Sequence, residues 1–210
     1  MGPAIAALFA EEGADVISVE GRLSEAPARE AAVEAAQDVD VLVANLALEP
    51  RHARLNEIED DDWQALFDAL VHPLMCLVRS AAPAMLERGS GKIVAVTSAA
   101  PLRGIPGVSA YCAARGAQNS FIRAAGLELA PGNVQVNAIA QNYVRNDTYY
   151  PESLVESDRF AAHLKRNVPI QRLAEARETA ELALFLASEK SNFVVGQVIP
   201  FAGGWVTTTG

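Results

Sequence analysis

The amino-acid sequence predicts an α/β fold in which a parallel sheet carries helices on both faces. Strand-like and helix-like segments alternate along the whole chain, which is the pattern of such folds. Residues 39–47 (VDVLVANLA) read as a buried strand that runs into a loop. The length of 210 residues suits a single domain (1–210) that is large enough to bury a substantial core.

The first part of the chain is expected to form a helix over 2–12, a strand over 15–20 (DVISVE) and an alanine-rich helix over 24–37. The order is unusual, because the first strand of a doubly wound sheet is central, and here no strand precedes the first helix. We therefore expect the sequence to lack a short leading segment that would carry this strand. The alternative is a sheet with rearranged strands.

A long amphipathic helix is predicted over about 60–87. Its start carries Asp60, Asp61 and Asp62, which suit the positive end of the helix dipole. Pro73 is expected to bend it. The helix has one apolar stripe at helical spacing: Trp63, Leu66, Leu70, Leu74, Leu77, Val78, Ala81 and Met85.

The rest of the chain continues the alternation. A glycine-rich turn at 89–91 precedes the next strand, and Pro131 and Gly132 stop the helix that follows. A long polar excursion, 141–173, is expected to cover the site as a loop and short helix. The remaining predicted elements are a strand at 92–97, a helix at 108–129, a strand at 133–140, a helix at 175–188 and a strand at 197–204.

Composition excludes several classes of function. The formal net charge is −9, from 17 basic and 26 acidic residues, which argues against nucleic acid or an anionic membrane as the main partner. No apolar run reaches the length of a spanning helix, and no basic-start signal peptide opens the chain. Cys76 and Cys112 are the only cysteines, so a cytoplasmic location is expected. The three histidines lie in no ligand set, and no metal site is expected.

Three residues carry the chemistry: Ser98, Tyr111 and Arg115. Ser98 ends the strand-like run GKIVAVTS, whereas Tyr111 and Arg115 are one helical turn apart and share a face. A phenol is a poor base at neutral pH, because its reference pKa is about 10, unless a nearby cation favours its anion. A guanidinium is such a cation, so the trio predicts a serine-positioned tyrosine base.

The order of elements, together with Ser98, Tyr111 and a basic residue at 115, resembles the short-chain dehydrogenase/reductase superfamily over nearly the whole chain. Asn45 and the FAGGW segment (201–205) also resemble that superfamily. The resemblance implies a doubly wound, Rossmann-like parallel sheet, here without its first strand.

Three positions depart from the dehydrogenase pattern. Arg115 replaces a lysine that holds the nicotinamide ribose, Leu70 replaces an asparagine, and the segment 141–143 (Gln-Asn-Tyr) replaces a Pro-Gly that makes room for the nicotinamide. These departures, with the VHPL (71–74) and NYV (142–144) segments, resemble the halohydrin dehalogenases, a branch of the superfamily that uses no cofactor.

That resemblance implies that Tyr111 removes the hydroxyl proton of a vicinal haloalcohol while Ser98 holds the oxygen and Arg115 stabilises the phenolate. The alkoxide then expels halide and forms an epoxide. The resemblance places the halide at Gln141, Asn142, Tyr143 and Val144, where small anions could enter in the reverse reaction. It places the wall of the substrate pocket at Pro101, Leu102, Tyr149 and Trp205.

Two other functions stay open at this point. The chain could be an NAD(P)-dependent reductase in which arginine replaces lysine, or a scaffold subunit without catalysis. For either enzyme the expected partner is a small molecule. The resemblance also implies a homotetramer built through the helices 60–87 and 108–129 and the last strand.

Overall fold

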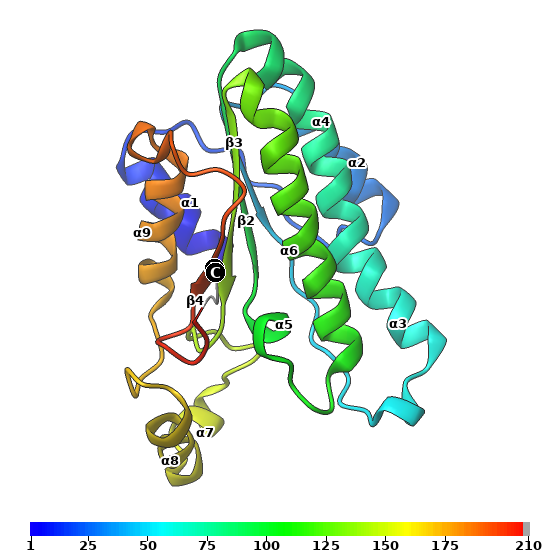
Figure 1. Ribbon diagram of the computed structural model, residues 1–210, viewed down its shortest axis with the longest axis vertical. Coiled ribbons are helices and arrows are strands. Elements are labelled where there is room, and N and C mark those ends of the chain that lie inside the picture. Colours follow the sequence, from blue (N-terminus) through cyan, green and yellow to red (C-terminus); the bar gives the residue numbers. More distant parts are fainter. Residues whose placement is uncertain (208–210) are drawn as a thin grey trace.

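The computed structural model describes residues 1–207 and arranges them around a four-stranded parallel sheet (Figure 1). The strands lie in chain order: β1 (Val41–Asn45), β2 (Gly91–Ser98), β3 (Val134–Gln141) and β4 (Val198–Phe201). Every neighbouring pair is parallel, so the carboxyl ends of all four strands meet at one edge of the sheet. The predicted α/β class is confirmed.

Helices cover both faces of the sheet. Helices α1 (Gly2–Glu11) and α9 (Ala176–Ala187) pack together on one face, and α6 (Ser109–Leu129) lies on the other beside α4 (His72–Arg88) (Figure 1). Helix α2 (Ala26–Ala35) packs against α4. Two separate apolar clusters fill the two interfaces, because the side chains of a strand alternate between the faces.

The predicted long helix is present, with a break in its middle. It consists of α3 (Asp60–Leu66), a π-helical turn η2 (Phe67–Val71) and α4. The π-turn ends two residues before Pro73, which lies in the first turn of α4. The apolar stripe is buried except for Trp63, which is 41% exposed and stacks on Phe67.

The stretch 60–88 is long and apolar enough to cross a membrane by length and composition alone. Its apolar stripe is part of the cluster between the helices and the sheet, as in a core helix of a globular domain.

Short elements connect these layers. Helix α5 (Ala100–Arg103) follows β2, and the excursion after β3 contains two short helices, α7 (Glu152–Val155) and α8 (Asp158–Asn167). Single 3₁₀ turns complete the connections: η1 (Leu55–Glu57), η3 (Ala130–Gly132) and η4 (Glu189–Ser191).

The strand predicted at 15–20 is wrong. Val16, Ile17 and Val19 are exposed, and the segment has no regular secondary structure. A strand needs a neighbour for its backbone N–H and C=O groups, and no strand of residues 1–207 lies beside this one. The other predicted helices and strands are present, with their ends displaced by a few residues.

Candidate active site

Ser98 and Tyr111 come from two elements that meet at the carboxyl edge of the sheet. Ser98 is the last residue of β2 and is buried, and its Oγ accepts a hydrogen bond from the Ala100 N–H at 3.1 Å. Helix α6 is tied to the same strand end, because Asn119 Nδ2 donates to the Ser98 carbonyl at 3.1 Å. The Ser98 and Tyr111 hydroxyls share no hydrogen bond within residues 1–207, and the Ser98 O–H donates to no other residue there.

Tyr111 and Arg115 form a direct pair on α6, as their spacing predicts. Arg115 Nε donates to the Tyr111 hydroxyl at 3.1 Å, and the guanidinium carbon lies 5.2 Å from the ring centroid. Both side chains are buried, with Arg115 only 4% exposed. The predicted contact between the guanidinium and the phenol is therefore present.

Tyr149 joins this pair from the excursion after β3. Its hydroxyl donates to the Leu48 carbonyl at 3.0 Å, and its N–H donates to Asn146 Oδ1 at 2.9 Å. Burial raises the pKa of Tyr149 to about 12; the neighbouring Tyr111 also raises it, whereas Arg115 acts in the opposite direction. The structure therefore brings this predicted pocket residue next to the tyrosine and arginine of the base.

The segment after β3 carries the four residues predicted to bind halide. Gln141 lies beside Ser98 in the sheet, and its side chain accepts from Thr179 Oγ1 at 3.3 Å. The Asn142 N–H is used by the sheet, since it donates to the Phe201 carbonyl at 3.0 Å. Tyr143 has a positive φ of 56°, which a bulky residue rarely adopts. This conformation turns the chain out of the sheet.

Tyr150 lies at the centre of this segment, and the sequence analysis did not single it out. Its hydroxyl donates to Asn142 Oδ1 at 2.6 Å and lies 3.2 Å from the Tyr143 N–H, which also donates to Asn142 Oδ1. Burial raises the pKa values of Tyr143 and Tyr150, so both phenols stay neutral donors at ordinary pH. The one sequence signal for a role of Tyr150 was its position directly after the predicted pocket residue Tyr149.

The Val144 N–H makes no hydrogen bond to another residue in the part of the chain that the structure describes, although Val144 is only 1% exposed. Buried N–H groups are almost always paired in native proteins. Of the four backbone N–H groups predicted to face an anion, this one has no partner in residues 1–207, whereas the Tyr143 N–H donates to Asn142 Oδ1 and to the Tyr150 hydroxyl.

The other predicted pocket residues lie near the same sites. Leu102 and Trp205 pack against the cluster that contains Tyr111, and Pro101 lies against α6 at Gly116. Trp205 also meets the Tyr143 ring edge-on, with centroids 5.8 Å apart. Trp205 therefore contacts both the core cluster that contains Tyr111 and the segment after β3.

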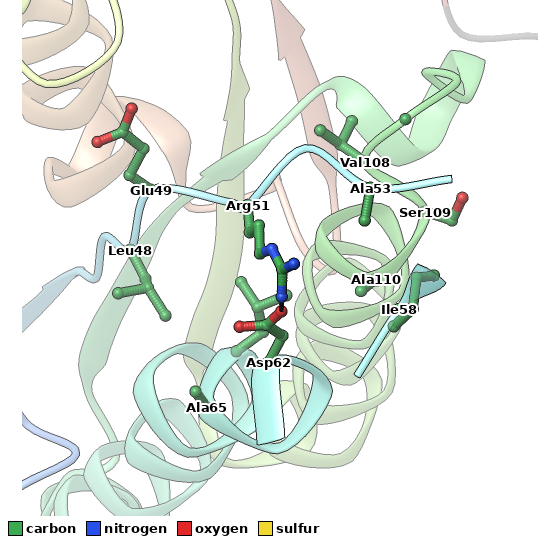
Figure 2. Close-up of a pocket in the computed structure, with 12 residues that line it drawn as sticks. Leu48, Glu49, Arg51, Ala53, Ile58, Asp62, Ala65, Val108, Ser109 and Ala110 are labelled. Atoms are coloured by element: carbon green, nitrogen blue, oxygen red, sulfur yellow. Dashed lines mark hydrogen bonds and ion pairs between the residues drawn. The ribbon is translucent and has the colours of Figure 1, made fainter. Parts of the chain in front are cut away.

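A cavity of about 210 Å³ borders the site (Figure 2). Residues of the loop after β1, the start of α3 and the start of α6 line it, among them Leu48 and Ala110. The ion pair between Arg51 and Asp62, 2.7 Å long, lies across it in Figure 2. Because Tyr111 and Arg115 are not among its lining residues, the cavity is next to the base and does not contain it.

Two features of the residues present differ from the nicotinamide site that the dehydrogenase pattern implies. Each guanidinium nitrogen of Arg115 already donates within the protein: Nε to Tyr111, one terminal nitrogen to Gln118 and the other to the Leu46 carbonyl. The guanidinium is therefore not extended toward a ribose, as the corresponding lysine would be. Beyond β3, the Tyr143 and Tyr150 rings stack, and Asn142 Oδ1 accepts hydrogen bonds from the Tyr150 hydroxyl and from the Tyr143 N–H.

Metal ligands are also not grouped: no set of three His, Cys, Asp or Glu residues within 1–207 could hold a metal ion.

Comparison with known proteins gives two kinds of relative. A family model described as enoyl-(acyl carrier protein) reductase matches residues 24–206. The chain is 34% identical to 3-oxoacyl-[acyl-carrier-protein] reductase FabG of Thermotoga maritima over 168 residues. That match covers 80% of this chain and 66% of the relative, so the chain spans about two thirds of that protein's length.

The fold of this chain closely resembles the folds of several solved structures. One described as a short chain dehydrogenase/reductase family protein matches with a TM-score of 0.83 and 30% identity, over 97% of this chain and 92% of its own. Halohydrin dehalogenase (HheC), bound to ethyl (2S)-oxiran-2-ylacetate, matches with a TM-score of 0.81 and 30% identity, over 97% of this chain and 83% of its own. The similar proteins thus include both reductases and a dehalogenase.

Proposed function

The chain belongs to the short-chain dehydrogenase/reductase superfamily, and from this premise we propose that it is a cofactor-independent carbon–halogen lyase of the halohydrin dehalogenase type. The reaction converts a vicinal haloalcohol into an epoxide with release of halide. In reverse, a small anion such as azide, cyanide or nitrite opens the epoxide ring.

One observation carries the proposal: the guanidinium of Arg115 is directed at Tyr111 and at acceptors inside the protein. A reductase needs this position to hold a cofactor as well as to assist the tyrosine. In this chain the cation has the second task alone, which suits chemistry with a phenolate base and no hydride carrier. Arginine fits this task because it stays charged over the whole working pH range.

In the proposed reaction the proton is transferred at Ser98 and Tyr111. The Ser98 hydroxyl donates to the substrate oxygen and holds it beside Tyr111, while its Oγ stays fixed by the Ala100 N–H. The Tyr111 phenolate accepts the substrate's hydroxyl proton. The resulting alkoxide attacks the adjacent carbon from behind, the carbon–halogen bond breaks with its electron pair on the halide, and the proton later passes from Tyr111 to water.

The halide leaves on the side of residues 141–144. Negative charge grows on the halogen in the transition state, so fixed hydrogen-bond donors there lower the barrier. Within residues 1–207 the Val144 N–H is the donor without a partner there. The Tyr143 N–H, which donates to Asn142 Oδ1 and to the Tyr150 hydroxyl, would have to exchange these acceptors for the anion. Neither donor carries a formal charge. Uncharged donors hold a departing anion without binding it so tightly that release is blocked.

The test is halide release from a panel of vicinal bromo- and chloroalcohols with no cofactor added. The matched controls are isomers with the halogen one carbon further away, which cannot close to an epoxide. We expect halide only from the vicinal compounds, together with an equal amount of epoxide. Absence of halide from every vicinal compound would contradict the proposal.

A reductase is the second candidate, because the family model and the Thermotoga relative are both described as reductases. In that function Arg115 would have to turn from its internal acceptors toward the cofactor. Titration with reduced nicotinamide cofactor separates the two candidates. Binding at micromolar concentration, with oxidation of the cofactor by a carbonyl compound, would favour the reductase.

A further inference from the structure

Arg115 is a buried cation that has no anionic partner. It takes part in none of the ion pairs among residues 1–207, although its side chain is only 4% exposed. Burying a charge is costly unless hydrogen bonds replace its hydration. Three neutral acceptors supply those bonds here: the Tyr111 hydroxyl, the Leu46 carbonyl and the Gln118 side chain.

Gln118 is the side chain among these acceptors that the proposed reaction does not use. It is 1% exposed, and its Oε1 accepts from an Arg115 terminal nitrogen at 2.8 Å. Its Nε2 donates to the Leu70 carbonyl at 2.7 Å. These two bonds fix the orientation of the amide, because a flipped amide would set NH₂ against the guanidinium and oxygen against a carbonyl.

The far end of this link is an irregular part of the backbone. Leu70 lies in the π-helical turn η2, just before Pro73, and its side chain is fully buried. Gln118 thus joins the α6 helix, which carries the base, to the break in the long helix that packs against it. One end of the amide is therefore bonded to the Arg115 side chain and the other to the backbone of η2.

We propose that Gln118 is a positioning residue, which holds the Arg115 guanidinium against Tyr111 and leaves its positive charge uncompensated. A glutamate of the same length would accept the same bond, but its negative charge would compete with the phenolate for the cation. The neutral amide orients Arg115 and leaves the Tyr111 phenolate as its only anion. This inference rests on the proposed role of Tyr111 as the base.

The first test compares Gln118→Glu with the wild type by the ultraviolet absorbance of tyrosinate during a pH titration. Tyr149 and Tyr150 lie near Tyr111 and also contribute absorbance, so the same titration of Tyr111→Phe is subtracted from each curve. We expect the midpoint of the Tyr111 signal to move to higher pH, with about a tenfold smaller phenolate fraction at neutral pH, since a charge close to a titrating group commonly shifts it by a unit or more.

The matched control is Gln135→Glu, which places a carboxylate at another buried glutamine, on β3, whose amide donates to Asn133 and not to Arg115. This variant should leave the Tyr111 midpoint unchanged. An unchanged midpoint in a folded Gln118→Glu protein would overturn the proposal.

A second measurement covers the case in which Gln118→Glu does not fold. Gln118→Met keeps the volume and removes both hydrogen bonds, so the guanidinium should become mobile. We expect the Arg115 Nε–H, followed by nitrogen-15 NMR, to exchange with solvent at least about tenfold faster than in the wild type, since local exchange reports local opening. Equal exchange in the two proteins would overturn the proposal.

These readouts separate this inference from the proposed function. If the Tyr111 midpoint moves but no haloalcohol releases halide, the lyase proposal fails and the role of Gln118 stands. If halide is released while the midpoint does not move, the role of Gln118 alone fails.

Discussion

The two sides of the candidate site are built from different kinds of structure. The base side consists of Ser98, Tyr111 and Arg115, which lie on β2 and α6 and are all buried. The anion side is the segment 142–150, which leaves the sheet with a positive φ at Tyr143 and contains no regular element. One side lies on regular elements, and the other lies on an irregular segment, although Tyr143 and Val144 in that segment are buried as well.

The bonds that hold the two sides also differ. Arg115 is held by neutral, buried acceptors, whereas the chain beyond the anion side returns to α9 through exposed ion pairs of Arg145 and Arg172. Exposed ion pairs are weak and depend on pH and salt, whereas buried hydrogen bonds depend on packing. The comparison implies that the proton-transfer geometry is fixed more firmly than the anion geometry.

Removal of the base should have the largest effect. In Tyr111→Phe the hydroxyl that would take the substrate proton is lost, so halide release should fall by about 10²–10⁴-fold, the usual contribution of general acid–base catalysis. The initial rate of halide release from the best vicinal haloalcohol measures this. Retention of cooperative thermal unfolding would show that the loss is chemical.

Cys112→Ala is the control for that variant. Cys112 follows Tyr111 in the chain, but its side chain lies about 100° further around the helix. The Cys112→Ala protein should therefore keep nearly full activity. A Tyr111→Phe protein that still released halide at a rate near that of Cys112→Ala would remove Tyr111 from the mechanism.

Two glycines of α6 test how tightly the base side is packed. A Cβ at Gly126 would lie 2.6 Å from the Gly196 Cα and 3.0 Å from the Val136 carbonyl oxygen, whereas a Cβ at Gly116 would lie at an ordinary 3.5 Å from Pro101. Gly126→Ala should therefore lower the free energy of unfolding by about 1–3 kcal/mol. Gly116→Ala should raise it by about 0.5–1 kcal/mol, because alanine favours the helix.

Urea unfolding of both variants measures the difference. Equal stability of the two would mean that α6 is free to move away from the sheet, and the contrast between a firm base side and a looser anion side would then weaken.

The same contrast explains what could be predicted from the sequence. Tyr111 and Arg115 were predicted together because helical spacing alone sets them on one face, and Ser98 because a strand end is easy to recognise. Tyr150 and Gln118 were missed, since their roles arise from contacts with distant residues such as Leu70, which no local pattern encodes. The strand at 15–20 was wrong for a related reason: a strand forms only where a neighbouring strand lies beside it.

A smaller effect is expected on the anion side. Tyr150→Phe removes the hydroxyl that accepts from the Tyr143 N–H and donates to Asn142 Oδ1, so the backbone donors of the anion side lose one fixing hydrogen bond, and inhibition by bromide or azide should weaken about 3–10-fold. Tyr149→Phe is the matched control, because that hydroxyl is bonded to Leu48 and lies by the base. If Tyr149→Phe weakened anion inhibition more than Tyr150→Phe, the anion would have to bind nearer the base than proposed.

The smallest effect concerns the ion pairs through which the chain returns from the anion side to α9. Hydrogen bonds from Arg172 and from the Glu175 N–H lower the pKa of Glu178 from 4.5 to about 2. A carboxyl group whose pKa is lower in the folded than in the unfolded chain stabilises the fold at pH values above its unfolded pKa. This stabilisation is lost as the pH falls toward the folded pKa of about 2. Glu178→Gln should therefore be slightly less stable than the wild type at neutral pH, and the two should converge in acid.

The urea midpoint of each protein, measured from neutral pH down to acid pH, tests this expectation. Glu181→Gln is the control, because Glu181 pairs with Arg177 on the surface of α9 and accepts no backbone N–H. Its difference from the wild type should be smaller at neutral pH, since it lacks the bond to the helix start. A Glu178→Gln difference that stayed constant into acid would mean that packing, and not charge, holds the anion side, and the two sides would then be alike.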